Sequence, residues 1–450
     1  MTNGPTPLKI WQKLAYASGQ AGNVVGYQLI STFVLALYLP TVGKGEQLIP
    51  GTLLGVGTFL VLNILARGFD TFFDPFLANT SDRSTHRLGR RRIFMIVGVF
   101  PLALVTALIF LPPGDPGSLT NVIWLGFTMT AYFGFFSVYV APYLALLPEL
   151  APDKAENTKL STLQAAAALV GAMIVSVVAP PLFLHEGAEA QSSMKAMAVA
   201  LAVMSFILLL VPVLAIDERA LVHRKEGEAA SHLGFVASLK ATFADRGFRP
   251  YVLGCTLFFC GFTVLQTGAY FYVTALLNKE PSAQPLVVGP LFGVAALSFV
   301  PVAMLANKIG KRRMIIAGAL FLALDMGIGI PLLPSMPFLT IPVFALGGVP
   351  IAMFLALPNS MLADVCEANA RATGQRREAM FFGAQGFLQK ISLALAAGSF
   401  SQLAETFGKS VDNPLGIQLS GPLAAVFLVG SAICFFLYPE AEVQRIASGK

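Results

Sequence analysis

Three charged side chains recur with helical spacing inside one apolar stretch. Arg67, Asp70 and Asp74 stand at positions i, i+3 and i+7, so an α-helix places all three on one face. An ionised side chain within a membrane costs at least about 2.5–3.5 kcal/mol. Because two ionised carboxylates one turn apart repel, the pair either holds a proton or binds a small cation. The spacing predicts a cation site, with a fixed salt-bridge cluster between helices as the alternative.

A fourth charge of this kind is Lys390, which lies in a later apolar stretch, residues 380–404, and is flanked by Gln385 and Gln389. If Lys390 reaches the same cavity, the two cations and two carboxylates sum to zero, and a neutral set is tolerated in lipid. Asp325 stands alone in a third stretch, where it is either a helix contact or a minor functional residue.

The composition indicates an integral membrane protein. Of the 450 residues, 56% are hydrophobic and 12% charged, whereas soluble domains carry about 25% charged residues. Apolar runs of roughly 20 residues, enough to cross the hydrocarbon core, recur along the whole chain. The net charge of +6 is typical of cytoplasmic loops of a membrane protein, so no nucleic acid partner is expected.

The apolar runs predict an all-α fold of twelve membrane-spanning helices. The expected spans are 14–40, 51–78, 93–112, 119–148, 161–184, 194–216, 248–277, 286–306, 314–333, 337–363, 380–404 and 418–438. A polar connection at 217–247 is expected to be a cytoplasmic linker between two six-helix halves, residues 1–216 and 248–450.

The basic residues predict the orientation. Of the 30 Lys and Arg residues, 24 fall on the side of the two termini, while Lys44, Lys195, Lys279 and Lys409 fall on the other. Positive charge favours the cytoplasmic side, so both termini are expected in the cytoplasm of a bacterial inner membrane. No bound partner chain is expected, and the protein should be a monomer surrounded by lipid.

A repeated motif supports the division into halves. The sequence at 77–79 and 89–93, Leu-Ala-Asn and Gly-Arg-Arg-Arg-Ile, returns at 305–307 and 310–314 as Leu-Ala-Asn and Gly-Lys-Arg-Arg-Met. Paired halves in transporters place a substrate site between them near the middle of the membrane.

The first copy of this motif also predicts a cytoplasmic gate, in which cations pair with carboxylates and helix C-termini when that side closes. Simple topogenic charge is the alternative. The expected gate residues are Asp82, Arg83, Gly89, Arg90, Arg91, Glu149 and Asp364.

Several motifs are absent from the sequence. No P-loop, H-E-x-x-H or G-x-S-x-G occurs, which argues against ATP-driven transport and common hydrolase chemistry. The four cysteines lack metal-site spacing and are expected to be core residues. An enzyme is therefore not expected, no cofactor is expected, and transport must draw its energy from an ion gradient.

The motifs at 67–75, 81–83 and 89–92, followed by Leu362-Ala-Asp364 and Gln389-Lys390, resemble those of the glycoside-pentoside-hexuronide:cation symporters. This is the melibiose permease group of the major facilitator superfamily. The resemblance implies the major facilitator fold and a site where Asp70 and Asp74 bind Na+, Li+ or H+. It also implies that Ser137 assists with its hydroxyl and that Lys390 interacts with the site.

The resemblance is weaker on the sugar side. Val24, Val140 and Ala165 stand where melibiose permease holds sugar hydroxyls with two aspartates and an arginine. Either a different glycoside or a lysophospholipid-like amphiphile is therefore expected as the small organic substrate. Polar residues that could line its site are Asn23, Tyr27, Gln28, Tyr139, Tyr143, Gln164, Gln266, Tyr270 and Gln389.

The sequence as a whole predicts a secondary active transporter in which a Na+ or H+ gradient drives symport of an organic solute by alternating access. The alternative from another class is a membrane receptor or scaffold that does not transport. A scaffold gains little from costly intramembrane charges, so Asp70, Asp74 and Lys390 favour the symporter.

Overall fold

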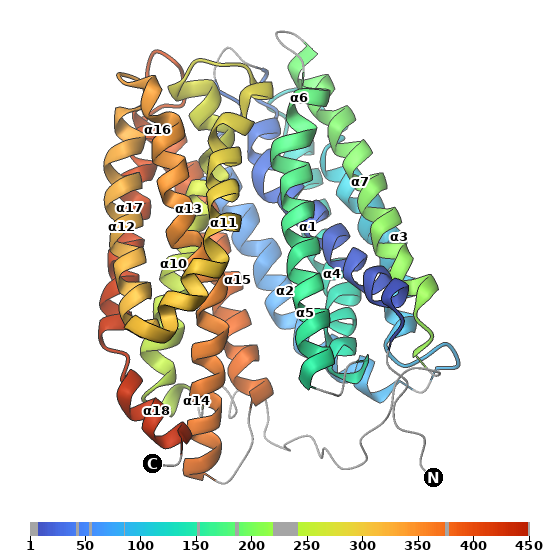
Figure 1. The fold of residues 1–450 in the computed structure, drawn as a ribbon. Helices are drawn as coiled ribbons and strands as arrows, with labels where there is room; N and C mark the ends of the chain where they lie inside the picture. Colours follow the sequence, from blue (N-terminus) through green and yellow to red (C-terminus); the bar gives the residue numbers. More distant parts are fainter. Residues whose placement is uncertain are drawn as a thin grey trace. The chain divides into compact units, whose positions relative to one another are not determined.

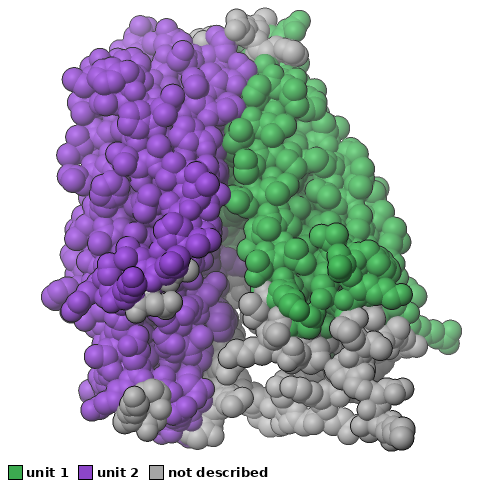
Figure 2. Space-filling view, viewed as in Figure 1, with its two compact units in different colours: residues 1–40, 44–53, 61–231 green, residues 41–43, 54–60, 232–450 purple. Residues whose placement is uncertain are grey.

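A computed structural model describes residues 8–41, 45–53, 56–84, 86–150, 154–184, 189–218, 242–373 and 378–448. It divides into two compact units, residues 1–40, 44–53 and 61–231 and residues 41–43, 54–60 and 232–450, which Figure 2 colours separately. Apart from two short strands, the regular structure of the described residues is helical (Figure 1). This confirms the predicted all-α class.

The elements up to residue 215 begin with a long buried helix. They are α1 (Ile10–Tyr38), β1 (Thr52–Leu53), β2 (Val56–Gly57), α2 (Thr58–Arg83), α3 (Arg92–Ile109), α4 (Leu119–Leu150), α5 (Lys154–Met173), the π-helical turn η1 (Ile174–Val178), α6 (Ala179–Phe183) and α7 (Ala190–Ala215).

The elements from residue 248 onward follow the same plan and end on a short helix. They are α10 (Phe248–Phe271), the π-helical turn η3 (Tyr272–Leu276), η4 (Pro281–Ala283), α11 (Pro285–Ile309), α12 (Lys311–Leu332), η5 (Pro337–Leu339), α13 (Thr340–Ala356), α14 (Pro358–Thr373), α15 (Glu378–Phe407), α16 (Leu415–Gln418), α17 (Ser420–Phe436) and α18 (Glu440–Ser448).

Ten helices among the described residues are long and apolar enough to cross a membrane. The two long helices outside this set are α2 and α15, with 26 and 30 residues. They are the helices that carry the intramembrane charges predicted to be functional, including Arg67, Asp70 and Lys390. Their polar residues lower their mean hydropathy, although their length suffices to cross the hydrocarbon core.

One predicted span boundary is wrong. The second span was expected to start at residue 51, but the two short strands come first and α2 starts at Thr58. The tenth span, expected over 337–363, falls within one candidate span, Pro337–Thr373, in which α13 and α14 meet at Leu357. The linker prediction for 217–247 stays untested, since 219–241 lie outside the described residues.

The two units repeat their helix packing. In the first, α1 lies against α5 and α7, and α3 lies against α4 and α7. In the second, α10 lies against α15 and α17, and α12 lies against α13 and α17. The first helix of each half thus packs on the fifth and sixth, and the third packs on the fourth and sixth.

A buried tyrosine near the start of each first helix repeats as well. The Tyr16 hydroxyl donates to the Tyr143 carbonyl of α4 at 2.7 Å, and the Tyr251 hydroxyl donates to the Pro358 carbonyl of α14 at 2.8 Å. Neither ring is exposed. Because a buried hydroxyl needs a partner, these bonds fix the position of each first helix against the fourth span.

Two contacts hold α1 against α5. The Lys13 ammonium donates to the Glu156 carboxylate, and hydrogen bonds from Lys13 and Lys159 hold the pKa of Glu156 below its ordinary value. Further along, a Cβ on Gly171 would lie 2.7 Å from the Ala21 carbonyl oxygen. The two backbones therefore approach as closely as glycine permits.

We expect Gly171→Ala to lower the free energy of unfolding by about 1–3 kcal/mol, because backbone atoms of α1 must move to admit the methyl group. Thermal unfolding of the purified protein in detergent measures this. Gly293→Ala is the matched control, since nothing lies within 4 Å of its added Cβ and alanine favours a helix. Equal stability of the two variants would contradict the close approach of α1 and α5.

Candidate functional site

The buried charge cluster of the first unit lies between α2 and α4. The Ser137 hydroxyl of α4 donates a hydrogen bond of 2.5 Å to the Asp70 Oδ1 of α2. Asp70 is 1% exposed and Ser137 is 2% exposed. Two residues 67 positions apart in sequence, both predicted for a cation site, are therefore in direct contact.

Arg67 stands one turn before Asp70 and is also buried. Its guanidinium carbon lies 4.6 Å from the centre of the Phe133 ring and 5.8 Å from that of Tyr27. The aromatic faces attract the cation electrostatically at these distances. Phe133 precedes Ser137 by one turn of α4, so the same face of α4 contacts both charged residues of α2.

Two predicted members of the site cannot be placed in this cluster. The side chain of Asp74 lies outside the described part of the chain. Lys390 is half-buried on α15 and belongs to the second unit. Their roles stay predictions.

The chemistry of the cluster suits a proton or a hard cation. A carboxylate and a hydroxyl offer oxygen ligands, which hard cations prefer over nitrogen and sulfur. Among the residues that the structure describes, no group of three or more His, Cys, Asp and Glu could hold a metal ion. A cation at Asp70 would rely on its carboxylate, the Ser137 hydroxyl and further oxygen ligands.

Arg67 lies beside an aromatic wall made of Tyr27, Tyr132, Phe133 and Phe136, of which Tyr27 and Phe133 contact its guanidinium. Phe136 lies 6.2 Å from Tyr27 and 5.7 Å from Tyr132, measured between ring centres. Tyr132 and Phe133 are 5.3 Å apart in an edge-to-face arrangement. Such a wall can stack on the face of a sugar ring or contact an apolar tail.

Three of the predicted substrate residues make hydrogen bonds inside the first unit. The Tyr143 hydroxyl donates to the Tyr16 carbonyl at 2.7 Å, and the Tyr139 hydroxyl donates to the Leu209 carbonyl at 2.6 Å. Gln164 donates from Nε2 to the Tyr143 hydroxyl at 3.1 Å. Both tyrosines have no exposed surface. The geometry favours helix contacts for them, and their substrate role stays a prediction.

The other predicted substrate residues differ in their contacts. Gln28 donates to the hydroxyls of Thr32 and Ser176, both at 3.2 Å. Tyr270 is buried, while Gln266 and Gln389 are half-buried on α10 and α15.

Asn23 stands apart from these, because its Oδ1 is buried and has no hydrogen-bond partner among the described residues. Gln20, three residues earlier on α1, has a buried Oε1 in the same condition. Sequence analysis missed Gln20, although its i, i+3 spacing from Asn23 places both on one face of α1. This face offers two buried hydrogen-bond acceptors.

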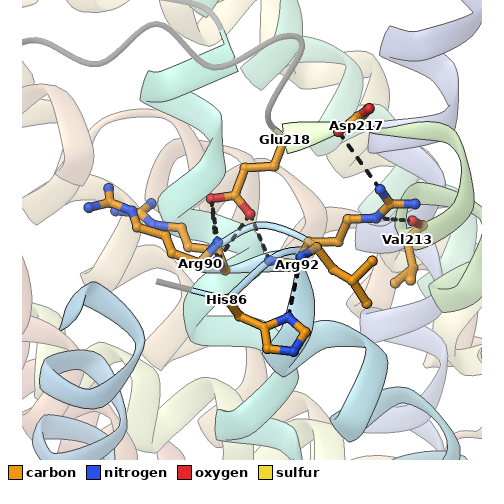
Figure 3. Close-up of polar contacts among 8 residues, drawn as sticks. His86, Arg90, Arg92, Val213, Asp217 and Glu218 are labelled. Atoms are coloured by element: carbon orange, nitrogen blue, oxygen red, sulfur yellow. Dashed lines mark hydrogen bonds and ion pairs between the residues drawn. The ribbon is translucent and has the colours of Figure 1, made fainter. Parts of the chain in front are cut away.

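Glu218 makes the strongest contact of the predicted gate region, and sequence analysis missed it. Its carboxylate accepts hydrogen bonds of 2.9 to 3.3 Å from the backbone N–H groups of Arg90, Arg91 and Arg92 (Figure 3). These N–H groups begin α3, where the helix dipole favours negative charge. Glu218 is 5% exposed.

Gly89 allows this close approach. Its φ is +109°, and a Cβ there would lie 2.9 Å from the Glu218 Cδ. Arg92 adds a hydrogen bond of 2.9 Å from Nε to the Val213 carbonyl and a 3.9 Å ion pair with Asp217 (Figure 3). The Glu218 carboxylate and the Arg92 guanidinium therefore hold the end of α7 against the start of α3.

The second unit contains a related arrangement. The Glu440 carboxylate accepts from the Arg312 N–H at 3.2 Å, and the Arg312 Nε donates to the Phe435 carbonyl at 3.1 Å. Glu440 follows Phe435 by five residues, as Glu218 follows Val213. The motif repeat predicted from sequence thus has a structural repeat, in which an acidic residue after the sixth helix contacts the start of the third.

The remaining gate residues are only partly described. Asp364 pairs with Lys311 at 2.7 Å within the second unit. The side chains of Asp82, Arg83 and Glu149 lie outside the described part. Pairing across a closed gate stays a prediction.

Comparison with known proteins identifies the family. The family model described as MFS/sugar transport protein matches residues 15–439. The chain belongs to this family. The match confirms the resemblance to glycoside-pentoside-hexuronide:cation symporters and the major facilitator fold that the motifs predicted.

Individual relatives agree over nearly the whole chain. An uncharacterized symporter of Synechocystis sp. is 24% identical and covers 95% of this chain and 93% of its own length. The isoprimeverose transporter of Lactiplantibacillus pentosus is 24% identical over 97% of this chain and 90% of its own. A crystal structure of a D-xylose-proton symporter, 16% identical, matches with a TM-score of 0.65 over 93% of this chain and 97% of that chain, which shows the fold.

Membership of the MFS/sugar transport family confirms that the chain is a multi-pass membrane transporter. The scaffold alternative is therefore not favoured. Within this MFS fold, the cluster at Asp70 and the contacts of Glu218 lie in the same unit and involve α2, α3, α4 and the end of α7.

We expect Glu218→Gln to lower the free energy of unfolding by about 1–3 kcal/mol, because an amide replaces a carboxylate that accepts from three helix N–H groups. Thermal unfolding in detergent is the measurement. Asp217→Asn is the matched control, since its side chain is 63% exposed and such ion pairs contribute about 1 kcal/mol or less. A larger effect of Asp217→Asn than of Glu218→Gln would contradict this account.

Proposed function

We propose that the protein is a symporter that couples the inward gradient of Na+ or H+ to the uptake of a glycoside. In this proposal, the protein spans a bacterial inner membrane with both termini in the cytoplasm. It works as a monomer without enzymatic activity or cofactor. The distribution of basic residues supports the orientation, and the family supports the transport of a sugar.

The observation that carries the proposal is the 2.5 Å hydrogen bond between the buried Ser137 and Asp70. In the absence of a cation, the hydroxyl donates its proton toward the carboxylate. When Na+ binds at Asp70, the Ser137 oxygen turns its lone pairs toward the ion and becomes a ligand, with Asp74 supplying further oxygen. A proton on Asp70 would neutralise the same charge without such ligands.

Neutralisation of this carboxylate links the ion to the transport cycle. Burying an ionised carboxylate in the low-dielectric interior is costly, so a cation or proton that binds there stabilises the protein. Arg67, held near Tyr27 and Phe133, and Lys390 set the net charge of the cluster in this proposal. The loaded state then changes conformation more readily than the unloaded state.

For the solute, Gln20 and Asn23 support a glycoside. Their buried oxygens accept hydrogen bonds, and sugar hydroxyls are donors that can satisfy them. The aromatic wall stacks on a sugar ring. An amphiphile of the lysophospholipid type would use the wall but would bring few donors to the two amides.

We expect Asp70→Asn to abolish uptake driven by an Na+ or H+ gradient, because the amide can neither bind the cation nor take up the proton. Ser137→Ala is expected to weaken cation binding about tenfold or more, since a hydrogen bond or ligand to a charged group is lost. Uptake of radiolabelled isoprimeverose, lactose and raffinose into proteoliposomes, with lysophosphatidylcholine included in the panel, measures both effects under imposed Na+ and pH gradients.

Thr106→Ala is the matched control, because its buried hydroxyl donates to Leu102 of its own helix, α3. It should leave the cation dependence unchanged. Accumulation that survives in Asp70→Asn would disprove the proposed coupling site. Transport of lysophosphatidylcholine but of none of the sugars would replace the glycoside with an amphiphile.

A further inference from the structure

Six helical threonines in the described part of the chain form the same type of hydrogen bond. Their hydroxyls donate to the carbonyl four residues earlier in the same helix, which satisfies a buried polar group without a second element. The threonines with such a bond, all between 2.7 and 3.1 Å, are Thr106, Thr128, Thr130, Thr256, Thr274 and Thr373.

Thr263 and Thr267 of α10 do not make this hydrogen bond to the helix backbone. They are 3% and 1% exposed, and neither Oγ1 has a hydrogen-bond partner within the described ranges of the chain. Thr256 precedes them on α10, and Thr274 follows them on η3, which continues α10. Both of these threonines bond to the carbonyl four residues earlier. The backbone of α10 is therefore able to satisfy a threonine, and the two central hydroxyls are not used in this way.

The two hydroxyls share one face of the helix. Thr263, Thr267, Tyr270 and Thr274 stand at i, i+4, i+7 and i+11, which gives a polar stripe on an otherwise apolar helix. At its end, Thr274 shares a 2.7 Å hydrogen bond with Thr41 of the same unit. A buried hydroxyl without a partner costs about 1–3 kcal/mol, so two of them on one turn gain stability from a ligand that supplies hydrogen bonds.

We propose that Thr263 and Thr267 are specificity-determining residues that hydrogen-bond the hydroxyl groups of the transported solute. This inference rests on the proposed symport and narrows its solute to a polyhydroxylated sugar. Side chains one helical turn apart have Cβ atoms about 5–6 Å apart, which suits two non-adjacent hydroxyls of one sugar ring. An apolar tail would leave both threonines unsatisfied and would bind poorly against this stripe.

The test compares Thr263→Val and Thr267→Val with the wild type in uptake of isoprimeverose, lactose and raffinose. Valine keeps the shape of threonine and removes the hydroxyl. Each variant should raise the KM for the transported sugar about 2–10-fold, the worth of one neutral hydrogen bond, while the Na+ or H+ concentration for half-maximal uptake is unchanged. Thr263→Ser and Thr267→Ser retain a hydroxyl and should restore most of the affinity.

Thr256→Val is the matched control on the same helix, because its hydroxyl is satisfied by Val252. It should leave the KM unchanged. Analogues of the same three sugars that each lack one hydroxyl complete a double-mutant cycle. One deoxy analogue should bind the wild type more weakly than the intact sugar does. The valine variant that lacks the contacting threonine hydroxyl should bind this analogue and the intact sugar equally well, which would show direct contact between the sugar hydroxyl and the threonine hydroxyl.

An unchanged KM in both valine variants would overturn the inference, as would a rise in KM that is the same for every deoxy analogue. The latter result would assign the hydroxyls to ordered water within the unit. Failure of the proposed symport is recognised separately, because the wild type itself would then accumulate none of the sugars under an ion gradient.

Discussion

The hydrogen bond between Ser137 and Asp70 joins α2 to α4 where a carboxylate is buried at the depth of the membrane. Water is not available there to solvate the charge, so its partners must come from the protein or from a bound cation. The first unit supplies one hydroxyl from α4 and places Arg67 one turn away, between aromatic rings of α1 and α4. These contacts bring α1, α2 and α4 together around one buried charged group, where we propose that the cation binds.

The same demand for partners shapes the ends of the helices. Glu218 satisfies three N–H groups at the start of α3, and Glu440 contacts the start of α12 in the second unit. A glutamine on the fifth helix of each unit, α5 and α15, contacts a buried tyrosine hydroxyl. Gln164 bonds the hydroxyl of Tyr143, and Gln385 accepts from the hydroxyl of Tyr251 at 3.0 Å. Duplicated halves thus retain the polar contacts that fix their helices, although most of the surrounding residues differ.

Some buried polar oxygens have no hydrogen-bond partner, and their positions suggest where a solute binds. The buried oxygens without partners in the described part of the chain include those of Gln20 and Asn23 of α1 and of Thr263 and Thr267 of α10. These are the first helices of the two units, and each pair lies on one helical face. Such groups can be retained where a solute completes their hydrogen bonds.

The sequence by itself determined the fold class, because runs of about 20 apolar residues can be stable only as membrane helices. It also predicted Arg67, Asp70 and Lys390 as site residues, since a charged residue inside a membrane span is costly at any position.

Tertiary structure alone decided which polar residues already have partners. Tyr139 and Asn23 look alike as candidates in sequence, yet Tyr139 donates to Leu209 of a distant helix and the Asn23 oxygen has no such bond among the described residues. No sequence motif marked Glu218, whose role depends on the end of α7 lying next to the start of α3. Hydrogen bonding between residues far apart in the chain depends on helix packing, and no local pattern of residues encodes it.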